Sequence, residues 1–537
     1  MSAGHSPSAT RWWTLGIVAL GTFMLMLDLS VVSVALPQIH RTLHSSFSDL
    51  QWVYDAYALT LAIFLVAAGS TADRIGRKRV FQVGLAIFTA SSLACGFAGS
   101  AVELSSFRAA QGVGAAIIFA AGPALLGHEF HGKERATAFT VFGASVGLAV
   151  ATGPLIGGAL TGALSWRWIF YINVPVGILA IAIGVLRVRD SHRSKAQPAD
   201  WGGLLSFSIA LGAVVFATIR GPEQGWSSPV TITLYVVSAI FLAVFAVTEL
   251  RIGERAMLDL TFFRNPTFVG ISLVAMIGNA GALPPVFLET NYLENMLHTD
   301  AWGAGLRFLP LTCSMFVAGA IAGSLIGKVP FRVLLGASTG LLGIGLLFLL
   351  NTRADSPWTV LIPSLIIAGI GMGAFNPSRA ALAIGVAEPA KAGVASGINE
   401  TFQQVGIAVG IAGVGAFFQN RVASAFTSSD AGKQLGHAAA QQVASAISAG
   451  SINAAAQRGG SLRQPLLAAA RSSFITGFHD AMVVSAILAF IAGLIGLLIL
   501  RTKDLHSSAL STIPPDVNED SSEWPDEPSG APAGATI

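Results

Sequence analysis

The stretch WWTLGIVALGTFMLMLDLSVVSVAL runs from Trp12 to Leu36 and contains a single charged residue, Asp28. A membrane-spanning helix needs about 20 consecutive, mostly apolar residues, and this stretch supplies them. A charged side chain at the centre of a bilayer costs at least about 2.5–3.5 kcal/mol, so one that is present usually has a function. We therefore predict that the stretch is a transmembrane helix and that Asp28 carries a proton.

Composition extends this prediction to the whole chain. Of its 537 residues, 53% are hydrophobic and only 11% are charged, whereas soluble domains carry about 25% charged residues. We predict an all-α integral membrane protein with fourteen transmembrane helices. The apolar runs place these spans at 13–36, 51–72, 79–98, 103–126, 138–160, 169–187, 202–219, 230–250, 267–289, 303–327, 333–351, 358–382, 394–418 and 478–500.

Basic residues predict the orientation. They concentrate in the loops after the second, sixth and eighth spans, and the alternate loops hold one arginine each (Arg41, Arg167, Arg220 and Arg353). Lys and Arg beside spans favour the cytoplasmic side, so both termini should be cytoplasmic in a multi-pass protein of the cytoplasmic membrane. The net charge of +3 is explained by these loops and gives no indication of nucleic-acid binding.

The spans fall into a 6 + 2 + 6 pattern, and two related bundles around a midplane cavity are typical of transporters. The Ala-, Gln- and Ser-rich stretch after the thirteenth span predicts one or two short amphipathic helices, or alternatively a poorly ordered insert. We predict a cytoplasmic leader (1–12), an N-terminal six-helix bundle (13–190), two inserted helices (200–250), a C-terminal six-helix bundle (265–501) with an extracytoplasmic loop (419–477), and a disordered acidic cytoplasmic tail (502–537).

The loop after the second span has the pattern of a gate. It reads GSTADRIGRKRVF from Gly69 to Phe81, and its key residues are Gly69, Asp73, Arg74, Gly76, Arg77 and Lys78. Asp73 can accept hydrogen bonds from a facing helix N-terminus and pair with arginine. Gly76 permits a tight turn.

The fifth span contains a glycine–proline motif, Gly153-Pro154-Leu-Ile-Gly157-Gly158. Small residues let helices approach closely, and proline removes a backbone donor and bends the helix. Close, bent packing of this helix is therefore expected.

Arg108 of the fourth span is the candidate partner of Asp28. An arginine next to a carboxylate favours its charged form, and withdrawal of the arginine would reverse that effect, which is a plausible coupling switch. The alternative is that Arg108 extends to the outer interface and contacts water.

The second half offers further polar candidates. Glu400 in the thirteenth span could take part in proton coupling, or could form a static pair with Arg379 of the twelfth span. Glu289 and Glu294 could line the outer cavity and attract a cation, or could form an interfacial pair with Arg307 or water. The substrate-cavity candidates are Glu289, Asn291, Glu294, Asn279, Arg379 and Gln403.

These segments resemble known motifs. The 69–81 loop resembles the G-x-L-a-D-r-x-G-r-K signature of the major facilitator superfamily, with Thr71 in place of the usual Leu. The G-P-x-x-G-G motif resembles that of its exporters, and R-x-x-Q-G-x-G from Arg108 is similar to another family motif. The segment around Asp28 resembles that of the fourteen-helix drug:proton antiporter branch, with Ser30 and Ser33 replacing Thr and Asn. The resemblance covers residues 12–420 and 478–501.

The resemblance implies proton-coupled efflux, by antiport and alternating access, of amphipathic, cationic drugs or toxic metabolites across the cytoplasmic membrane. Its expected partners are a small amphipathic molecule, protons and the lipid bilayer, and we expect a monomer. Alternatives are a dedicated exporter of one secondary metabolite and a proton-coupled solute symporter. The sequence contains no Walker-type loop, metal-ligand cluster or nucleophile elbow, so we expect no cofactor, no metal and no enzymatic activity.

Overall fold

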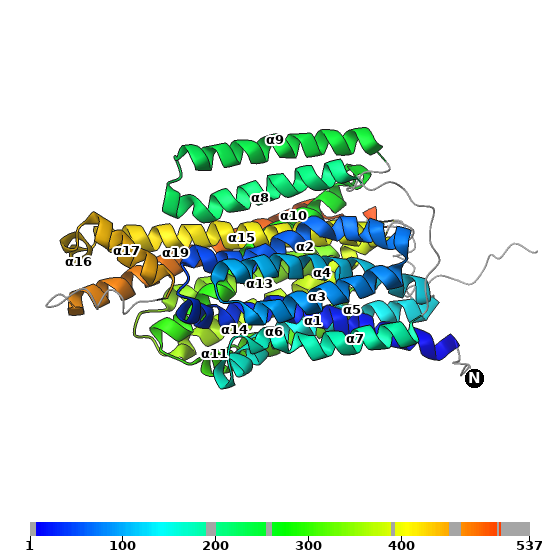
Figure 1. Cartoon of the computed structure of the whole chain (residues 1–537), viewed down its shortest axis with the longest axis horizontal. Coiled ribbons are helices and arrows are strands. Elements are labelled where there is room, and N and C mark those ends of the chain that lie inside the picture. The colour runs from blue at the N-terminus through cyan, green and yellow to red at the C-terminus, as the bar shows by residue number, and fades with distance from the viewer. Residues whose placement is uncertain are drawn as a thin grey trace, which may run out of the picture.

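The computed structural model describes residues 7–130, 132–188, 200–253, 260–387, 392–450, 463–501 and 504–505. These residues form helices joined by short connections (Figure 1). By length and composition, twelve of the described helices could cross a membrane, and a bent pair within residues 141–163 would make a thirteenth. The all-α, multi-pass prediction is confirmed, while the count of fourteen stays a prediction.

The N-terminal half contains seven helices in the described chain. They are α1 (Pro7–Leu43), α2 (Phe47–Ile75), α3 (Arg77–Phe97), α4 (Ala101–Glu129), α5 (Gly132–Ala163), α6 (Trp168–Tyr171) and α7 (Asn173–Arg187). α1 begins within the expected leader, so that residues 7–12 are helical. Proline is favoured in the first turn of a helix, and no helix breaker follows Pro7 before Trp12.

The C-terminal half begins after a short 3₁₀ turn (Leu260–Arg264). Its main helices are α10 (Pro266–Asn291), followed by a π-helical turn (Tyr292–Met296), α11 (Ala301–Arg307), α12 (Leu309–Leu325), α13 (Phe331–Phe348), α14 (Ile362–Gly385), α15 (Ala392–Ser428) and α19 (Arg463–Ile499).

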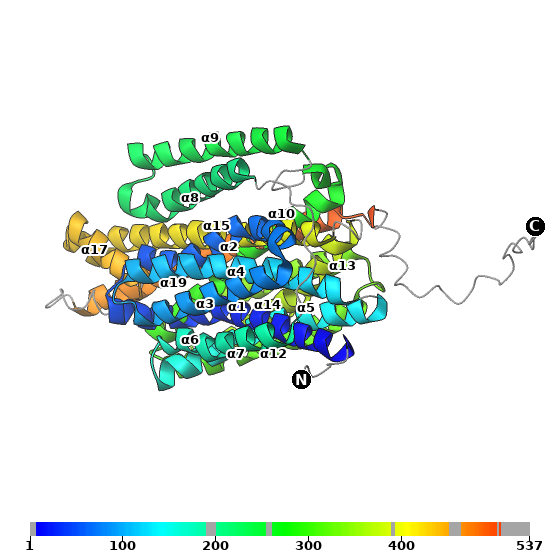
Figure 2. The ribbon, with the colours of Figure 1, turned by 45° about the vertical axis from the view of Figure 1, so that its right-hand side comes forward.

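Two helices lie outside this body. α8 (Trp201–Gln224) and α9 (Pro229–Ile252) pack on each other, and α8 also packs on α15 and α2 (Figure 2). Most of the apolar surface of α9 is not covered by other parts of the protein. In a bilayer such a surface faces lipid, which explains how α9 can leave so much apolar surface uncovered by protein.

The segment 419–477 differs from the expected loop. α15 continues to Ser428 and α19 already begins at Arg463, since residues 420–427 contain neither Gly nor Pro to stop the helix. The prediction of short helices is confirmed by α16 (Asp430–Gln434) and by α17 (His437–Ser448), which buries one apolar face. Residues 451–462, and all of the predicted tail 502–537 except 504–505, lie outside the described residues.

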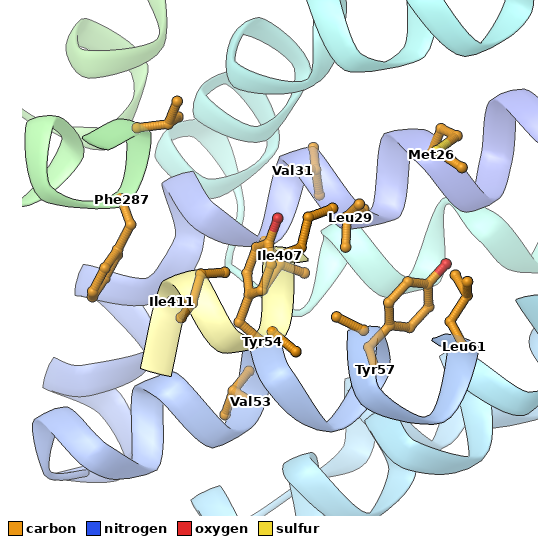
Figure 3. Packing of buried hydrophobic residues seen from close by; sticks show 14 of the residues in the cluster. Met26, Leu29, Val31, Val53, Tyr54, Tyr57, Leu61, Phe287, Ile407 and Ile411 are labelled. Carbon is orange, nitrogen blue, oxygen red and sulfur yellow. The ribbon is translucent and has the colours of Figure 1, made fainter. Parts of the chain in front are cut away.

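The two halves meet along two sets of helices. α5 packs on α11 and α12, and α2 packs on α15. Figure 3 shows the apolar side chains of this central region, where Tyr54 of α2 points toward Leu29 and Ile407. We call the end of the molecule where α1 passes into α2 the Arg41 end, and the end where α2 passes into α3 the Arg77 end.

Candidate transport site

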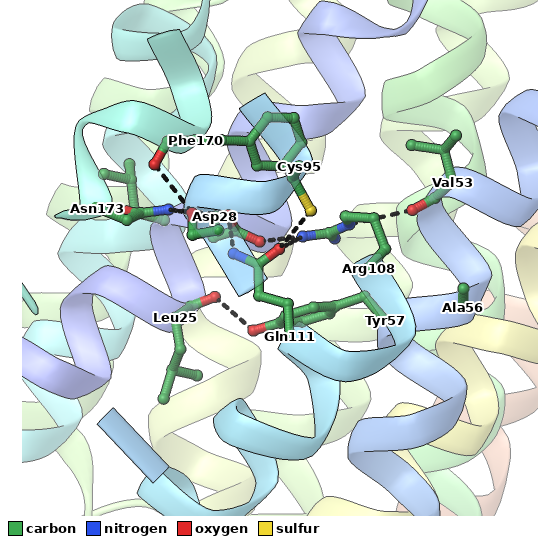
Figure 4. A network of polar contacts seen from close by, with 12 residues as sticks. Leu25, Asp28, Val53, Ala56, Tyr57, Cys95, Arg108, Gln111, Phe170 and Asn173 are labelled. Carbon is green, nitrogen blue, oxygen red and sulfur yellow. Dashed lines mark hydrogen bonds and ion pairs between the residues drawn. The ribbon is translucent and has the colours of Figure 1, made fainter. Parts of the chain in front are cut away.

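Asp28 lies in a fully buried polar network (Figure 4). One carboxylate oxygen forms an ion pair with Arg108 of α4. The other accepts hydrogen bonds from Gln111 Nε2 at 2.8 Å and from Asn173 Nδ2 at 3.0 Å. Arg108 and Gln111 are one turn apart on α4, which is the spacing that places two side chains on one helix face. The network therefore joins α1, α4 and α7.

Arg108 is held in the interior rather than at the interface. Its exposed fraction is 0%, its Nε donates to Val53 O at 3.1 Å, and its guanidinium lies 4.2 Å from the centre of the Tyr57 ring. The predicted contact with Asp28 is confirmed, and the alternative in which Arg108 extends to the outer interface is wrong. The Asp28 carboxylate supplies a counter-charge that the interface would not.

A second buried charge pair lies in the C-terminal half. Arg379 of α14 contacts Glu400 Oε1 of α15 at 2.5 Å, and it also donates to the side chain of Asn399. The pair predicted between Arg379 and Glu400 is therefore present. Neither residue lines the central cavity.

The central cavity lies between the two halves. Its walls come from α1, α2 and α5 on one side and from α10, α13, α14 and α15 on the other. Its volume is about 50 Å³, whereas pockets for drug-sized molecules hold about 300–1,000 Å³. The structure is therefore a contracted state, and the halves must separate before such a molecule can bind.

Three polar atoms at the cavity wall have no hydrogen-bond partner among the described residues. They are the hydroxyl of Tyr54, the amide oxygen of Asn376 and the amide oxygen of Gln403. Tyr54 is 2% exposed and Gln403 is 8% exposed. Buried polar groups are normally hydrogen-bonded, so these three atoms are available to a ligand or to water in the cavity.

The predicted cavity residues divide into two groups. Asn279 and Gln403 line the cavity, whereas Glu289, Asn291, Glu294 and Arg379 do not. Glu289 is buried in α10, and Asn291 accepts from Asn295 Nδ2 at 2.9 Å.

Glu294 takes part in a contact between the halves. Its carboxylate lies 2.9 Å from Arg41 NH2 of α1, whereas Arg307 donates to Gly303 O at 2.9 Å. The proposed pairing of Glu294 with Arg307 is thus wrong. Arg41 reaches Glu294 because the end of α1 lies beside the end of α10 when the Arg41 end is closed.

The glycine–proline motif packs α5 against two helices. A Cβ on Gly153 would lie 1.7 Å from Ser30 Oγ, and one on Gly157 would lie 3.0 Å from Val31 O, both on α1. A Cβ on Gly158 would lie 2.6 Å from Ala301 O of α11. The expected close packing is confirmed, and the α5 helix breaks before Thr152, where Pro154 withdraws a backbone donor.

The gate motif occupies the turn between α2 and α3. Gly76 has a φ of +116°, which L side chains rarely adopt, and its N–H bonds to Ala72 O. Arg77 donates to Ala124 O of α4 at 3.1 Å, and Lys78 Nζ lies 3.5 Å from Val185 O of α7. Gly69 faces Ala120 of α4 with room for a methyl group. The side chains of Asp73 and Arg74 lie outside the described part of the structure.

Asp55 is a polar residue that sequence reasoning missed. It is fully buried in α2, and neither carboxylate oxygen has a hydrogen-bond partner among the described residues. Gln51, one turn earlier, donates to Ile411 O of α15 at 2.9 Å, so this face of α2 looks toward the C-terminal half. An acid within the predicted span 51–72 was the signal that could have identified it.

Comparison with known proteins shows that this multi-pass helical chain is a transporter. Residues 18–411 match the model of the Major Facilitator Superfamily, and the chain belongs to that family. A bacterial homologue of the human lysosomal transporter Spinster, in an inward-facing and occupied conformation, has the same fold with a TM-score of 0.63 at 17% identity, over 94% of this chain and 99% of that chain.

Relatives of known role are similar over most of the chain. The multidrug resistance protein Stp of Mycobacterium tuberculosis is 33% identical over 409 residues, 76% of each chain. The tetracenomycin C resistance and export protein of Streptomyces glaucescens is 30% identical over 502 residues, 92% of this chain and 93% of its own. The methylenomycin A resistance protein of Streptomyces coelicolor is 33% identical over 399 residues, 74% of this chain and 84% of its own.

Proposed function

We propose that the protein exports amphipathic drugs or toxic metabolites across the cytoplasmic membrane by proton-coupled antiport. The observation that carries this proposal is the buried Asp28–Arg108 pair, a titratable group at membrane depth that ties three helices together. The names of the relatives, which include multidrug resistance and antibiotic export, support efflux.

The proposal includes the membrane topology. α2 and the bent α5 would complete the fourteen spans of the drug:proton antiporter branch, arranged as two six-helix bundles and the inserted α8–α9 pair. The basic residues that follow α2 favour a cytoplasmic Arg77 end, so that α1 begins and α19 ends in the cytoplasm. α16 and α17 would then lie outside the cell.

The proton would act through Asp28. Protonation removes the charge that balances Arg108, which favours a conformation in which Arg108 is solvated or finds other acceptors. α1 also packs on α5, and α5 packs on α11 and α12 of the other half. A change in the network would therefore alter how the halves pack. A proton can thereby shift the equilibrium between two conformations, provided that they differ in their affinity for it.

Outward opening would require contacts at the Arg41 end to break. Among the described residues these include the Arg41–Glu294 ion pair and the close packing of Gly158 on α11. Their separation would widen the cavity toward the outside, as alternating access requires.

A narrow substrate range is the second possibility. Several relatives are named for one compound each, among them the tetracenomycin C export protein and the probable actinorhodin transporter of Streptomyces coelicolor. A dedicated exporter of one metabolite is therefore the alternative to a multidrug exporter. Transport of several unrelated scaffolds would decide for the multidrug exporter.

The test is uptake into inverted membrane vesicles, with and without an acidic interior. The panel contains ethidium, doxorubicin and the analogue of doxorubicin whose amino group is replaced by hydroxyl. We expect at least one compound to accumulate when the gradient is present, and Asp28→Asn to abolish that accumulation. Asp430→Asn is the matched control, because its side chain is fully exposed on α16. Gradient-driven uptake by Asp28→Asn at the wild-type rate would overturn the coupling role.

A further inference from the structure

We propose that the central cavity selects uncharged compounds that carry several hydroxyl or N–H groups, in preference to lipophilic cations. This inference rests on the proposed function, because it names the class of compound that the exporter would carry. It replaces the cationic substrate expected from the sequence.

The first argument is the charge of the cavity wall. None of the described residues that line it is acidic or basic. A cation that enters must lose its water, and it would find no counter-charge in return. An uncharged molecule of the same size does not meet this cost.

The second argument is that two of the buried carboxylates, Asp28 and Glu400, are already paired with arginines. Asp28 is on the opposite side of α1 from the lining residues Met26 and Ser30, and it pairs with Arg108. Glu400 pairs with Arg379 in the same way. These carboxylates are therefore not available to a cation in the cavity while their arginines remain in place.

The third argument is the kind of polar atom that the wall presents. The amide oxygens of Asn376 and Gln403 have no partner in the described structure. The hydroxyls of Ser338 and Thr339 donate to Leu335 O at 3.0 and 2.8 Å, which leaves their oxygen lone pairs for a ligand. The wall is thus rich in acceptors, and a complementary ligand supplies donors.

The apolar part of the wall fits the same class of compound. Met26 and Met372 are flexible and adapt to irregular shapes, and Phe375 offers an aromatic face. A polycyclic or aromatic ligand could pack on these side chains while its hydroxyl or N–H groups meet the acceptors.

The test is the dissociation constant of a matched pair of ligands for the purified full-length protein in detergent. Doxorubicin carries an ammonium group, and its analogue carries a hydroxyl at the same position, so that the pair differs at this one group. We expect the hydroxyl analogue to bind at least about tenfold more tightly, a difference of about 1.4 kcal/mol. Equal affinities, tighter binding of doxorubicin, or no binding of the analogue would overturn the inference.

A variant pair tests whether the cavity wall sets this preference. Gln403→Glu places an acid in the wall, and it should reduce the preference for the hydroxyl analogue at least about tenfold. Gln441→Glu makes the same change on the exposed face of α17 and should leave the preference unchanged. Thermal unfolding of both variants shows whether they are folded. If Gln403→Glu does not fold, the ratio of the two dissociation constants for the wild-type protein still tests the inference.

The outcomes separate this inference from the proposed function. If the analogue binds selectively but no compound accumulates with a proton gradient, the selectivity stands and the proposed antiport fails. If compounds accumulate with the gradient but the cation is preferred, antiport stands and the inference on charge fails.

Discussion

Asp28 and Ser30 lie two residues apart on α1 and face different surroundings. Asp28 contacts Arg108 of α4 and Asn173 of α7, whereas Ser30 lines the cavity and donates to Ala149 O of α5 at 3.3 Å. Two residues rotate a helix by about 200°. One helix thus separates the proposed proton site from the proposed substrate site.

Asp28→Ala should destabilise the protein strongly. The change leaves Arg108 buried without its counter-charge, and the expected loss is about 3–5 kcal/mol in the free energy of unfolding. The measurement is unfolding of the purified protein in detergent.

Asp55→Asn, unlike Asp28→Ala, should not destabilise the protein. A buried carboxylate without hydrogen-bond partners is costly to keep charged, and an uncharged amide avoids that cost. We expect stability to be unchanged or raised by about 1 kcal/mol. A loss as large as that of Asp28→Ala would show that Asp55 is stabilised by a contact that this conformation does not contain.

Gly158→Ala should weaken closure of the Arg41 end. The new methyl group would collide with Ala301 O and with the Cα of Gly305 at 2.8 Å, and both are backbone atoms that cannot rotate away. Spin labels on Val102 of α4 and on Asn351, both exposed at the Arg41 end, would report a longer distance between the halves.

The control for Gly158→Ala lies on the same helix. Gly147→Ala adds the same methyl group where no heavy atom lies within 4 Å, so the distance distribution should match that of the wild type. Equal distributions for both variants would mean that the α5–α11 contact does not limit opening.

The Arg41–Glu294 ion pair should make a small contribution to the same equilibrium. Arg41 is 54% exposed, so the pair is worth about 0.5–1 kcal/mol. Arg41→Gln and Glu294→Gln should each increase the open population about two- to fivefold, since each kcal/mol changes a population ratio about fivefold. The same spin labels would measure this, and the double variant should show no further increase; additive effects would rule out the pairing.

Glu400→Gln should destabilise the protein through Arg379. Removal of the carboxylate charge leaves a buried guanidinium unbalanced, and we expect a loss of up to about 3–5 kcal/mol. The double variant Arg379→Met/Glu400→Leu should recover part of that loss in thermal unfolding. If Glu400→Gln instead impaired export of cations alone and kept its stability, Glu400 would be a substrate-binding residue.

The sequence predicted the features that depend on local pattern. Apolar length predicted most of the helices, the glycine–proline motif predicted the close packing of α5, and Gly76 predicted the turn between α2 and α3. The contact of Asp28 with Arg108 was predicted because an acid and a base at membrane depth are each costly to leave unpaired.

The features that the sequence did not predict depend on how distant helices face one another. Glu294 pairs with Arg41, 253 residues away, because the halves close at that end. Glu289, Glu294 and Glu400 are acids near the expected cavity, yet none of them lines it. Tyr54 and Asn376 line the wall although no periodicity marks them, since only the packed bundle defines which side is inward.

The position of Asp28 on the far side of α1 also bears on how such proteins diversify. Most polar groups of the cavity wall belong to the C-terminal half, whereas the Asp28 network belongs wholly to the N-terminal half. Under the proposed mechanism, mutations in the wall can change the cargo while the energy source is left intact. A lineage exposed to a new toxin could then adapt one half of the protein and inherit the other unchanged.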